Sequence, residues 1–319
     1  MSEQRDDDSS DEFRFLVGDA ARVGADGPLP AVRRVRVEVS DGRGISGLVF
    51  TPNAQASDAS APPAVAALHG AGLNAHSFDP MLLALGAPAV ALDLPGHGRS
   101  DWRADADYRP GTMASDVAAA IERLAPQPVA LVGHSLGGLT AAIIASERPD
   151  LVERLIVVDI TPGVSPAGDA GAVAEFILGK RDYGSIEEIV DRAVEFGIGS
   201  DRTALTRGVT LNTRLRADGR IEWTHHLAHL DRLPAAPGDP LPYAPIWAAL
   251  ETAQEHGIPV SLVRATRGML TEAHVAEWRQ RLPHSEIVEV AGPHNLHEAA
   301  PVELAGAVRG LCGGGGNAG

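Results

Sequence analysis

The chain has 319 residues, 44% of them hydrophobic and 22% charged, which is the composition of a globular protein with one large domain or two small ones. A formal net charge of -15 argues against the basic face that nucleic-acid binding needs, and no basic amphipathic stretch points to a membrane surface. The first ten residues lack the apolar stretch of a signal peptide, every apolar run is too short to span a bilayer, and the lone Cys312 cannot form a disulfide within the chain. We therefore expect a cytoplasmic protein that binds neither nucleic acid nor membrane.

The two ends of the chain differ in composition from the rest. Residues 1–30 are acidic and rich in Gly and Asp, so we expect a disordered arm there. The glycine-rich residues 313–319 are expected to form a disordered tail.

Between these ends, short apolar runs alternate with helical patterns. VRRVRVEVSD and GISGLVFTP alternate in the manner of two antiparallel strands. The remaining runs are continuously apolar, as in the strands of a buried parallel sheet, and they read AVAALHG, PAVALDLPG, PVALVGHS, LVERLIVVDI, PVSLVRA and SEIVEVAG. Candidate helices, for example 112–124 and 136–148, lie between them. The pattern predicts an α/β fold with helices on both faces of the sheet.

Residues 162–250 interrupt this alternation. SIEEIVDRAVEFG has a capping box before an amphipathic helix, NTRLRADGRIEWTHH has a turn at Asp218-Gly219 between two extended pieces, and PAAPGDPLPYAP is irregular. We interpret 162–250 as a cap inserted into a core of residues 31–161 and 251–312. Insertions at the carboxyl ends of parallel strands tend to cover ligand sites.

The stretch LVGHSLGG contains the pattern G-x-S-x-G, centred on Ser135, between a predicted strand and a predicted helix. In that context the pattern predicts a nucleophile elbow, a turn so sharp that side chains at Gly133 and Gly137 would collide. The serine hydroxyl then projects above the sheet, and the backbone N–H of Leu136 can face a developing oxyanion.

A serine hydroxyl needs a base to become a nucleophile. The base is expected after the last strand, where SEIVEVAG is followed by PHNLHEAAP. His294 lies just beyond that strand and is the predicted base, with His297, three residues later, as the alternative.

A second loop can complete an oxyanion site. In ALHGAG, small residues follow the third strand, so a backbone N–H, that of Ala71, can approach the substrate oxygen. Six residues are expected to line the substrate pocket: His69, Gly70, Gly72, His134, Trp223 and Trp247.

These motifs together resemble the α/β-hydrolase fold superfamily, over about residues 33–311. The resemblance is carried by LHGAG, DLPGHGRSDW, GHSLGG, VVDITP and GPHNLHE. It implies a mostly parallel eight-stranded sheet flanked by helices, a helical cap after the sixth strand, a Ser-acid-His triad, and neither a metal nor an organic cofactor. Haloalkane dehalogenases and epoxide hydrolases of this fold use aspartate where this chain has serine, so those two chemistries are not expected.

The position of the triad acid departs from the usual family pattern. Most relatives carry it after the seventh strand in a Gly-x-x-Asp pattern, but that loop here reads VRATRGMLTEAH and offers only Glu272. The sixth strand ends in Asp159, level with the elbow, as in some branches of the family. We predict Asp159 as the acid and keep Glu272 as the alternative.

The predicted function is hydrolysis of a carboxylic ester of a small or medium apolar acid through an acyl-enzyme. The same triad also serves C–C, thioester or lactone cleavage, because the pocket selects the chemistry. A non-catalytic ligand receptor and a cofactor-free lyase or cyclase are the rivals from other classes. The three histidines of HHLAHL lack a matching carboxylate or cysteine motif, so we expect no metal site there.

Overall fold

Eight strands form one sheet at the centre of the molecule. The computed structural model describes residues 12–25, 27–52, 61–165, 168, 171–230 and 242–313. In spatial order the strands are β1 (Ala31–Glu38), β2 (Gly44–Thr51), β4 (Ala89–Leu92), β3 (Val65–Leu68), β5 (Val129–His134), β6 (Val152–Val158), β10 (Val260–Arg267) and β11 (Glu286–Pro293). β2 pairs antiparallel with β1 and with β4, and all other neighbours are parallel. The predicted eight-stranded, mostly parallel sheet is confirmed.

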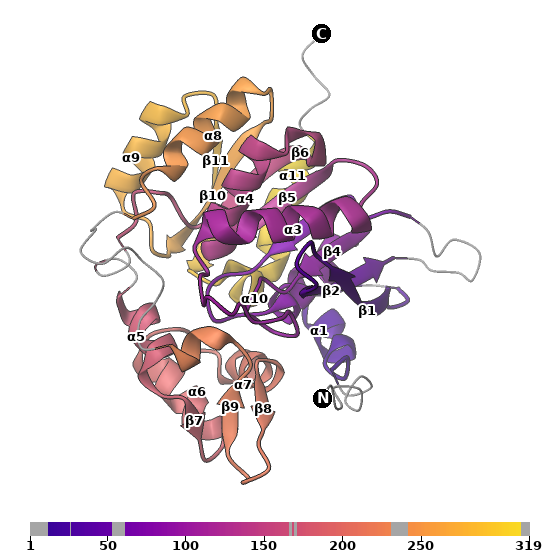
Figure 1. The fold of residues 1–319 in the computed structure, drawn as a ribbon, viewed down its shortest axis with the longest axis vertical. Helices are drawn as coiled ribbons and strands as arrows, with labels where there is room; N and C mark the ends of the chain where they lie inside the picture. The colour runs from indigo at the N-terminus through magenta and orange to yellow at the C-terminus, as the bar shows by residue number, and fades with distance from the viewer. Residues whose placement is uncertain are drawn as a thin grey trace.

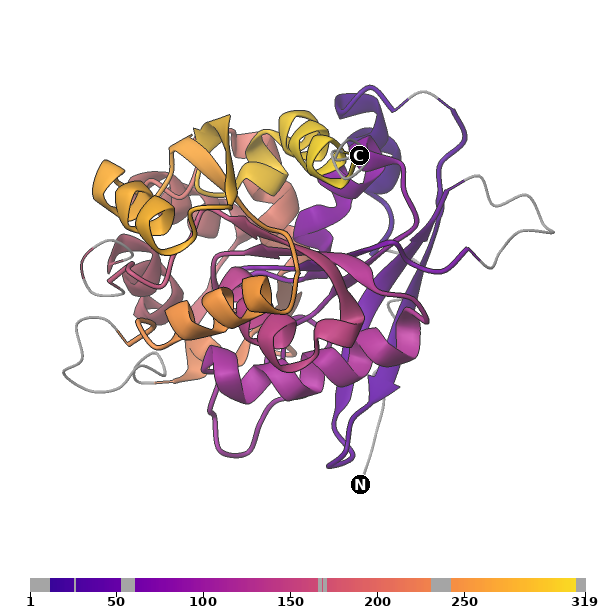
Figure 2. The ribbon, with the colours of Figure 1, turned by 90° about the horizontal axis from the view of Figure 1, so that it is seen from above.

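Helices cover both faces of this sheet, as the sequence predicts (Figures 1 and 2). On one face lie α3 (Pro110–Leu124), α4 (Leu136–Glu147) and α8 (Ile246–Glu255), with α9 (Glu272–Arg281) packed beside α8. On the other face lie α1 (Leu16–Arg22), α2 (Asp79–Leu85), α10 (Leu296–Ala299) and α11 (Pro301–Gly313). Short 3-10 turns, η1 (Ala75–Phe78) and η2 (Pro149–Leu151), precede α2 and β6. The strands β3, β4 and β5 are buried along their whole length, which explains their continuously apolar sequences.

The segment predicted to be a cap, called the cap below, lies between β6 and β10 in the sequence, and its elements lie to one side of the large sheet (Figure 1). It contains α5 (Gly171–Gly179), β7 (Asp182–Tyr183), α6 (Ile186–Glu195), α7 (Arg202–Leu211), β8 (Thr213–Leu215), β9 (Ile221–Trp223) and η3 (His226–His229). The predicted turn at Asp218-Gly219 joins the two predicted extended pieces, which are β8 and β9. Strand β7 pairs with β9 as a third strand, so the segment contains a small sheet as well as the helices of the predicted helical cap. Phe176, Tyr183 and Trp223 form part of a small apolar core inside the cap.

The predicted end of the cap at residue 250 is wrong. Helix α8 starts at Ile246 and packs against α4, so residues 246–250 belong to the hydrolase core. The proline-rich sequence before α8 has no helical periodicity, so it did not indicate where that helix begins. Residues 231–241 of this segment lie outside the described residues.

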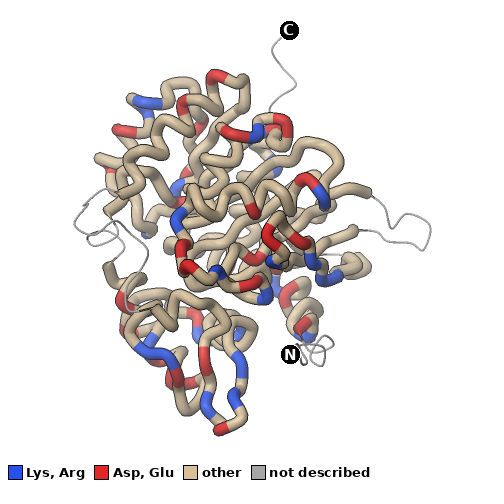
Figure 3. Tube along the Cα trace, viewed as in Figure 1, with Lys and Arg blue, Asp and Glu red and all other residues tan. Residues whose placement is uncertain are grey.

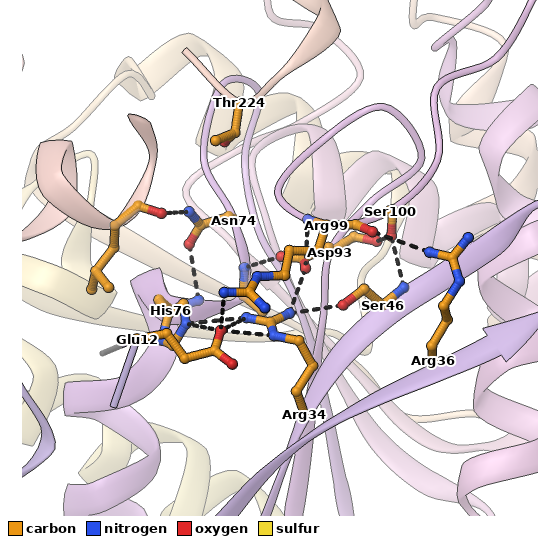
Figure 4. A network of polar contacts seen from close by, with 12 residues as sticks. Glu12, Arg34, Arg36, Ser46, Asn74, His76, Asp93, Arg99, Ser100 and Thr224 are labelled. Atoms are coloured by element: carbon orange, nitrogen blue, oxygen red, sulfur yellow. Dashed lines mark hydrogen bonds and ion pairs between the residues drawn. The ribbon is translucent and has the colours of Figure 1, made fainter. Parts of the chain in front are cut away.

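The expectation of a disordered arm over residues 1–30 is wrong from Glu12 onward. Apolar side chains of α1, including Leu16 and Ala20, pack against Leu83 of α2. The buried carboxylate of Glu12 pairs with Arg34, which also reaches Asp93, as Figure 4 shows. A few well-spaced apolar residues and paired charges thus order a segment whose average composition is acidic. Residues 1–11 lie outside the described residues, as do 314–319 of the predicted tail, and Gly313 ends α11.

Charges of both signs are interspersed along the described chain (Figure 3). Many arginines pair with an acidic residue two positions away in the sequence, for example Arg109 with Asp107 and Arg148 with Asp150. Among the described residues, no helix combines the length and the apolar character needed to cross a bilayer.

Candidate active site

Ser135 occupies a strained turn between β5 and α4. Its backbone has φ 51° and ψ -121°, a conformation that residues with a side chain rarely adopt. A Cβ on Gly133 would lie 2.5 Å from the carbonyl oxygen of Gly137, and a Cβ on Gly137 would lie 2.3 Å from the carbonyl oxygen of Leu68. The collisions predicted from G-x-S-x-G are therefore real, and the two glycines are what permit the turn.

His294 follows β11 and is hydrogen-bonded to Asp159, which follows β6. The Nδ1–H of His294 donates to Oδ2 of Asp159 at 2.8 Å. That bond fixes the imidazole tautomer and leaves the Nε2 lone pair free to accept a proton. The His294 side chain is 18% exposed, whereas the Asp159 side chain is fully buried.

The loop after β10 is shaped around the carboxylate of Asp159. The backbone N–H groups of Ala265 and Met269 donate to its Oδ1 and Oδ2, each at 2.9 Å. A Cβ on Gly268 would lie 2.0 Å from Oδ2, so only glycine leaves room for the acid here. The sequence analysis did not identify Gly268 as a site residue. The available signal was a glycine in the loop after the seventh strand, at a place where that loop carries no aspartate.

Glu272, the alternative acid, lies at the protein surface. Its side chain is 80% exposed and pairs with Arg264 at 2.7 Å. The geometry therefore brings Asp159, and not Glu272, to His294, the predicted base.

His297, the alternative base, is fully buried. It stacks on Phe78 with ring centroids 4.8 Å apart, and burial lowers its pKa to about 3. Neither of its ring nitrogens has a hydrogen-bond partner. His297 is thus a neutral packing residue in a fold that places His294 against the acid.

His134 does not line the pocket as predicted, because it lies buried behind the elbow. Its Nε2–H donates to the carbonyl oxygen of His294 at 3.1 Å, and burial holds its pKa well below the usual value. The two imidazole centroids are 4.5 Å apart. His134 therefore anchors the loop that carries His294.

The loop of Ala71 lies directly beside the elbow. A Cβ on Gly70 would approach the Cβ of Ser135 to 3.2 Å. Leu136 is the first residue of α4, so its backbone N–H has no acceptor within the helix. Ala71 and Leu136, the two predicted oxyanion donors, thus belong to two different elements that both adjoin Ser135.

His69 also differs from the expectation of a pocket residue. It is fully buried, its Nε2 accepts from the backbone N–H of Leu94 at 2.9 Å, and its Nδ1–H donates to the carbonyl of Gly70 at 2.8 Å. Both ring nitrogens serve the backbone, and burial lowers the pKa of the imidazole. His69 therefore fixes the start of the loop that contains Ala71, which is the predicted oxyanion loop.

Cap residues cover the far end of this loop at Gly72. A Cβ on Gly72 would lie 3.0 Å from Cγ1 of Ile177 and 3.6 Å from Nε2 of His225. Trp223 lies one layer behind, with its ring 5.4 Å from that of His225. Trp247 belongs to α8 and packs against Trp278, so the prediction that it lines the pocket from the cap is wrong.

Two of the three histidines of HHLAHL, His226 and His229, lie beside the ring of Trp102, whereas His225 lies beside Trp223. His225 accepts from the backbone N–H of Ala228, and His226 accepts from the hydroxyl of Tyr108 at 2.7 Å while stacking on Trp102. Within the ranges that the structure describes, no three His, Cys, Asp or Glu side chains converge as metal ligands would.

Fold and site together define the class of the protein. The sequence profile of the α/β hydrolase fold matches residues 63–301. The chain belongs to this family, and it is a hydrolase.

Comparison with individual proteins narrows this class. The chain is 35% identical over 311 residues to esterase Rv0045c of Mycobacterium tuberculosis, across 94% of this chain and 95% of that one. A solved structure of that esterase superposes with a TM-score of 0.78 at 32% identity, covering 95% of this chain and 98% of the other. The chain is also 29% identical over 261 residues to the mouse sn-1-specific diacylglycerol lipase ABHD11, across 77% of this chain and 80% of that protein.

Proposed function

We propose that the protein is a serine esterase that works through an acyl-enzyme on Ser135. The observation that carries the proposal is the 2.8 Å hydrogen bond from His294 to the buried Asp159, beside a strained serine elbow. A ligand receptor would have no use for a serine held at φ 51° or for an imidazole whose tautomer is fixed by a carboxylate. The similarity to an esterase over nearly the whole chain points to the ester bond as the one that is cleaved.

Each residue then has a defined step in the reaction. The hydroxyl of Ser135 attacks the ester carbonyl while Nε2 of His294 takes its proton, and the imidazolium is stabilised by Asp159. His294 then donates this proton to the departing alkoxide, which leaves as an alcohol. A water molecule, deprotonated by His294, attacks the acyl group and regenerates the serine.

The oxyanion of each tetrahedral intermediate is stabilised by the backbone N–H groups of Ala71 and Leu136. Donors of this kind act on charge that develops only in the transition state, and one donor is worth roughly 10²–10³-fold in rate.

The surroundings of the elbow favour an apolar acyl group. Ala71 and Leu136, which adjoin the elbow, are partly buried apolar residues, as is Met269, whose backbone N–H bonds Asp159, and Ile177 approaches Gly72 from the cap. Contact between such apolar side chains and a hydrocarbon acyl chain stabilises the bound substrate. A difference of a few apolar carbons between two substrates changes their relative kcat/KM by roughly 1–3 kcal/mol. We propose a small or medium apolar carboxylic ester as the substrate.

A comparison of substrates with matched acyl groups tests the proposal. Purified wild type and Ser135→Ala are assayed on p-nitrophenyl esters of increasing chain length, and on thioesters, lactones and β-diketones. The proposal expects kcat/KM to be highest for an ester and to vanish in Ser135→Ala. A thioester, lactone or diketone turned over much faster than every ester would assign the same residues to that other bond. Ester turnover that survives in folded Ser135→Ala would remove the serine mechanism.

A further inference from the structure

The oxyanion loop is held at both ends, once by the core and once by the cap. Residues 70–73 form a turn in which the N–H of Leu73 donates to the carbonyl of Gly70 at 3.2 Å, and Gly72 adopts φ 73°. The core holds the first end, because His69 also donates to the carbonyl of Gly70. The cap holds the second end, because the side-chain amide of Asn212 donates to the carbonyl of Gly72. The N–H of Ala71 shares a planar peptide group with the carbonyl of Gly70 and takes no part in the hydrogen bond that closes the turn.

The hydrogen-bond partners fix which way the amide of Asn212 points. The N–H of His76 can only donate, so the atom of Asn74 that faces it at 3.0 Å is Oδ1. The Nδ2 of Asn74 therefore faces the cap, where it donates to the carbonyl of Leu211 at 2.8 Å and to Oδ1 of Asn212 at 3.2 Å. With its Oδ1 thus engaged, Asn212 presents its NH₂ group to Gly72.

Asn212 is itself held firmly by the cap. Its side chain and backbone are buried, and its carbonyl accepts from the N–H of Thr224 at 3.0 Å. The helix that it ends, α7, is fastened to the core by Arg207, whose guanidinium is 2.6 Å from Asp19 and 2.8 Å from Asp79. The contact at Gly72 is therefore made by a part of the cap that is itself docked on the core.

We propose that Asn212 is a positioning residue that sets the oxyanion donor of Ala71, so that the cap completes the catalytic site as well as covering it. The inference rests on the proposed esterase function. The carbonyl of Gly72 shares a planar peptide group with the N–H of Leu73, which donates to the carbonyl of Gly70, and that carbonyl shares a peptide group with the N–H of Ala71. By holding the first of these peptide groups, the amide of Asn212 opposes a rotation that would turn the N–H of Ala71 away from the oxyanion. A misplacement of about 1 Å in such a group can cost on the order of 10²-fold in rate.

A positioning role differs from a packing role in what it does to ground-state binding. The oxyanion forms only in the tetrahedral state, so a weakened donor lowers kcat and leaves substrate binding unchanged. A loss of packing would lower thermal stability or weaken the binding of every ligand alike.

The test compares Asn212→Ala and the nearly isosteric Asn212→Asp with wild type. Asp201→Ala is the control, since Asp201 caps the exposed start of the same helix and makes no contact with the loop. For each protein, kcat and KM are measured on one p-nitrophenyl ester. Inhibition constants are measured for the matching trifluoromethyl ketone, which forms a tetrahedral adduct, and for the matching amide, which does not.

Both Asn212 variants are expected to lose roughly 10–100-fold in kcat. Their KM and amide affinity should stay within about threefold, and their affinity for the ketone should fall by the same factor as kcat/KM. Asp201→Ala should lose thermal stability and keep its kinetics. Unchanged kcat/KM in a folded Asn212 variant, or equal losses for ketone and amide, would overturn the inference. If Asn212→Ala fails to fold, Asn212→Asp decides alone. A wild-type protein without ester turnover would instead refute the proposed function.

Discussion

The two sides of Ser135 are held in different ways. On the acid–base side, His294 and Asp159 follow strands β11 and β6, which flank β10, so one sheet holds both residues. On the oxyanion side, the loop at Ala71 is fixed by His69 of the core at one end and by Asn212 of the cap at the other. The first side is therefore independent of the cap, and the second depends on how the cap is docked. Substitutions on the acid–base side should therefore lower kcat strongly, whereas substitutions that loosen the cap should act more on stability.

The largest effect is expected for His294→Ala. Removing the base should lower kcat on the order of 10⁴-fold or more, since a serine hydroxyl is not activated without it. His297→Ala is the matched control, and it should lower the melting temperature by leaving a cavity beside Phe78 while kcat stays within about tenfold. A dead His297→Ala beside an active His294→Ala would reverse the assignment of the base.

Asp159→Asn should have the next largest effect, a fall of about 10³–10⁴-fold in kcat, because the amide cannot hold His294 in its productive tautomer. Glu272→Gln serves as the control on a carboxylate that is 80% exposed, and its kcat should stay within a small factor. An inactive Glu272→Gln beside an active Asp159→Asn would reassign the triad acid to Glu272, in the loop after β10.

On the cap side, Arg207→Met should act on stability more than on chemistry. Arg207 is 7% exposed, and its loss leaves the buried Asp19 and Asp79 without their guanidinium partner. Such a broken pair costs about 3–5 kcal/mol, which denaturant unfolding would detect. Arg202→Met, which removes an exposed pair with Asp191 on the same helix, should cost less than about 1 kcal/mol. Equal unfolding free energies for the two variants would show that Arg207 does not fasten the cap.

The smallest effect is expected for Glu298→Gln, which should change how the melting temperature depends on pH. Glu298 lies beside Gly208 of α7. Burial raises the pKa of Glu298 to about 7, well above its usual value near 4.5. Between these two pH values the folded protein binds more protons than the unfolded chain, so stability falls as pH rises and the penalty is complete above about pH 7.

Glu298→Gln removes this penalty. Its melting temperature relative to wild type should therefore rise between pH 5 and 8 and level off above that range. Glu303→Gln, at an exposed position of α11, should give a difference that does not vary with pH. A constant difference for Glu298→Gln would contradict the raised pKa.

The acid–base side of the site could be predicted from the sequence because local rules govern it. G-x-S-x-G demands a turn, and the ends of successive parallel strands meet at one edge of a sheet, which brings Asp159 to His294. The oxyanion side could be predicted only in part. Asn212 lies 140 positions from Gly72 in the sequence, in a cap without any motif, and no pattern indicates that contact.

The wrong expectations also have physical causes. His69 and His134 were placed in the pocket because they adjoin its motifs, yet both are buried, and both ring nitrogens of His69 and Nε2 of His134 are hydrogen-bonded to backbone groups. The acidic average composition of the first 30 residues concealed the apolar stripe of α1. The proline-rich sequence before α8 concealed the start of that helix, so Trp247 was assigned to the cap although it belongs to the core.

Covalent labelling with a fluorophosphonate, read by mass spectrometry, tests the central claim most directly. The account predicts one adduct per wild-type chain, located on the peptide that contains Ser135. It also predicts no adduct in Ser135→Ala and much slower labelling in His294→Ala, because the hydroxyl then lacks its base. Equal labelling of wild type and Ser135→Ala, or an adduct on another residue, would contradict the claim that Ser135 is the activated nucleophile.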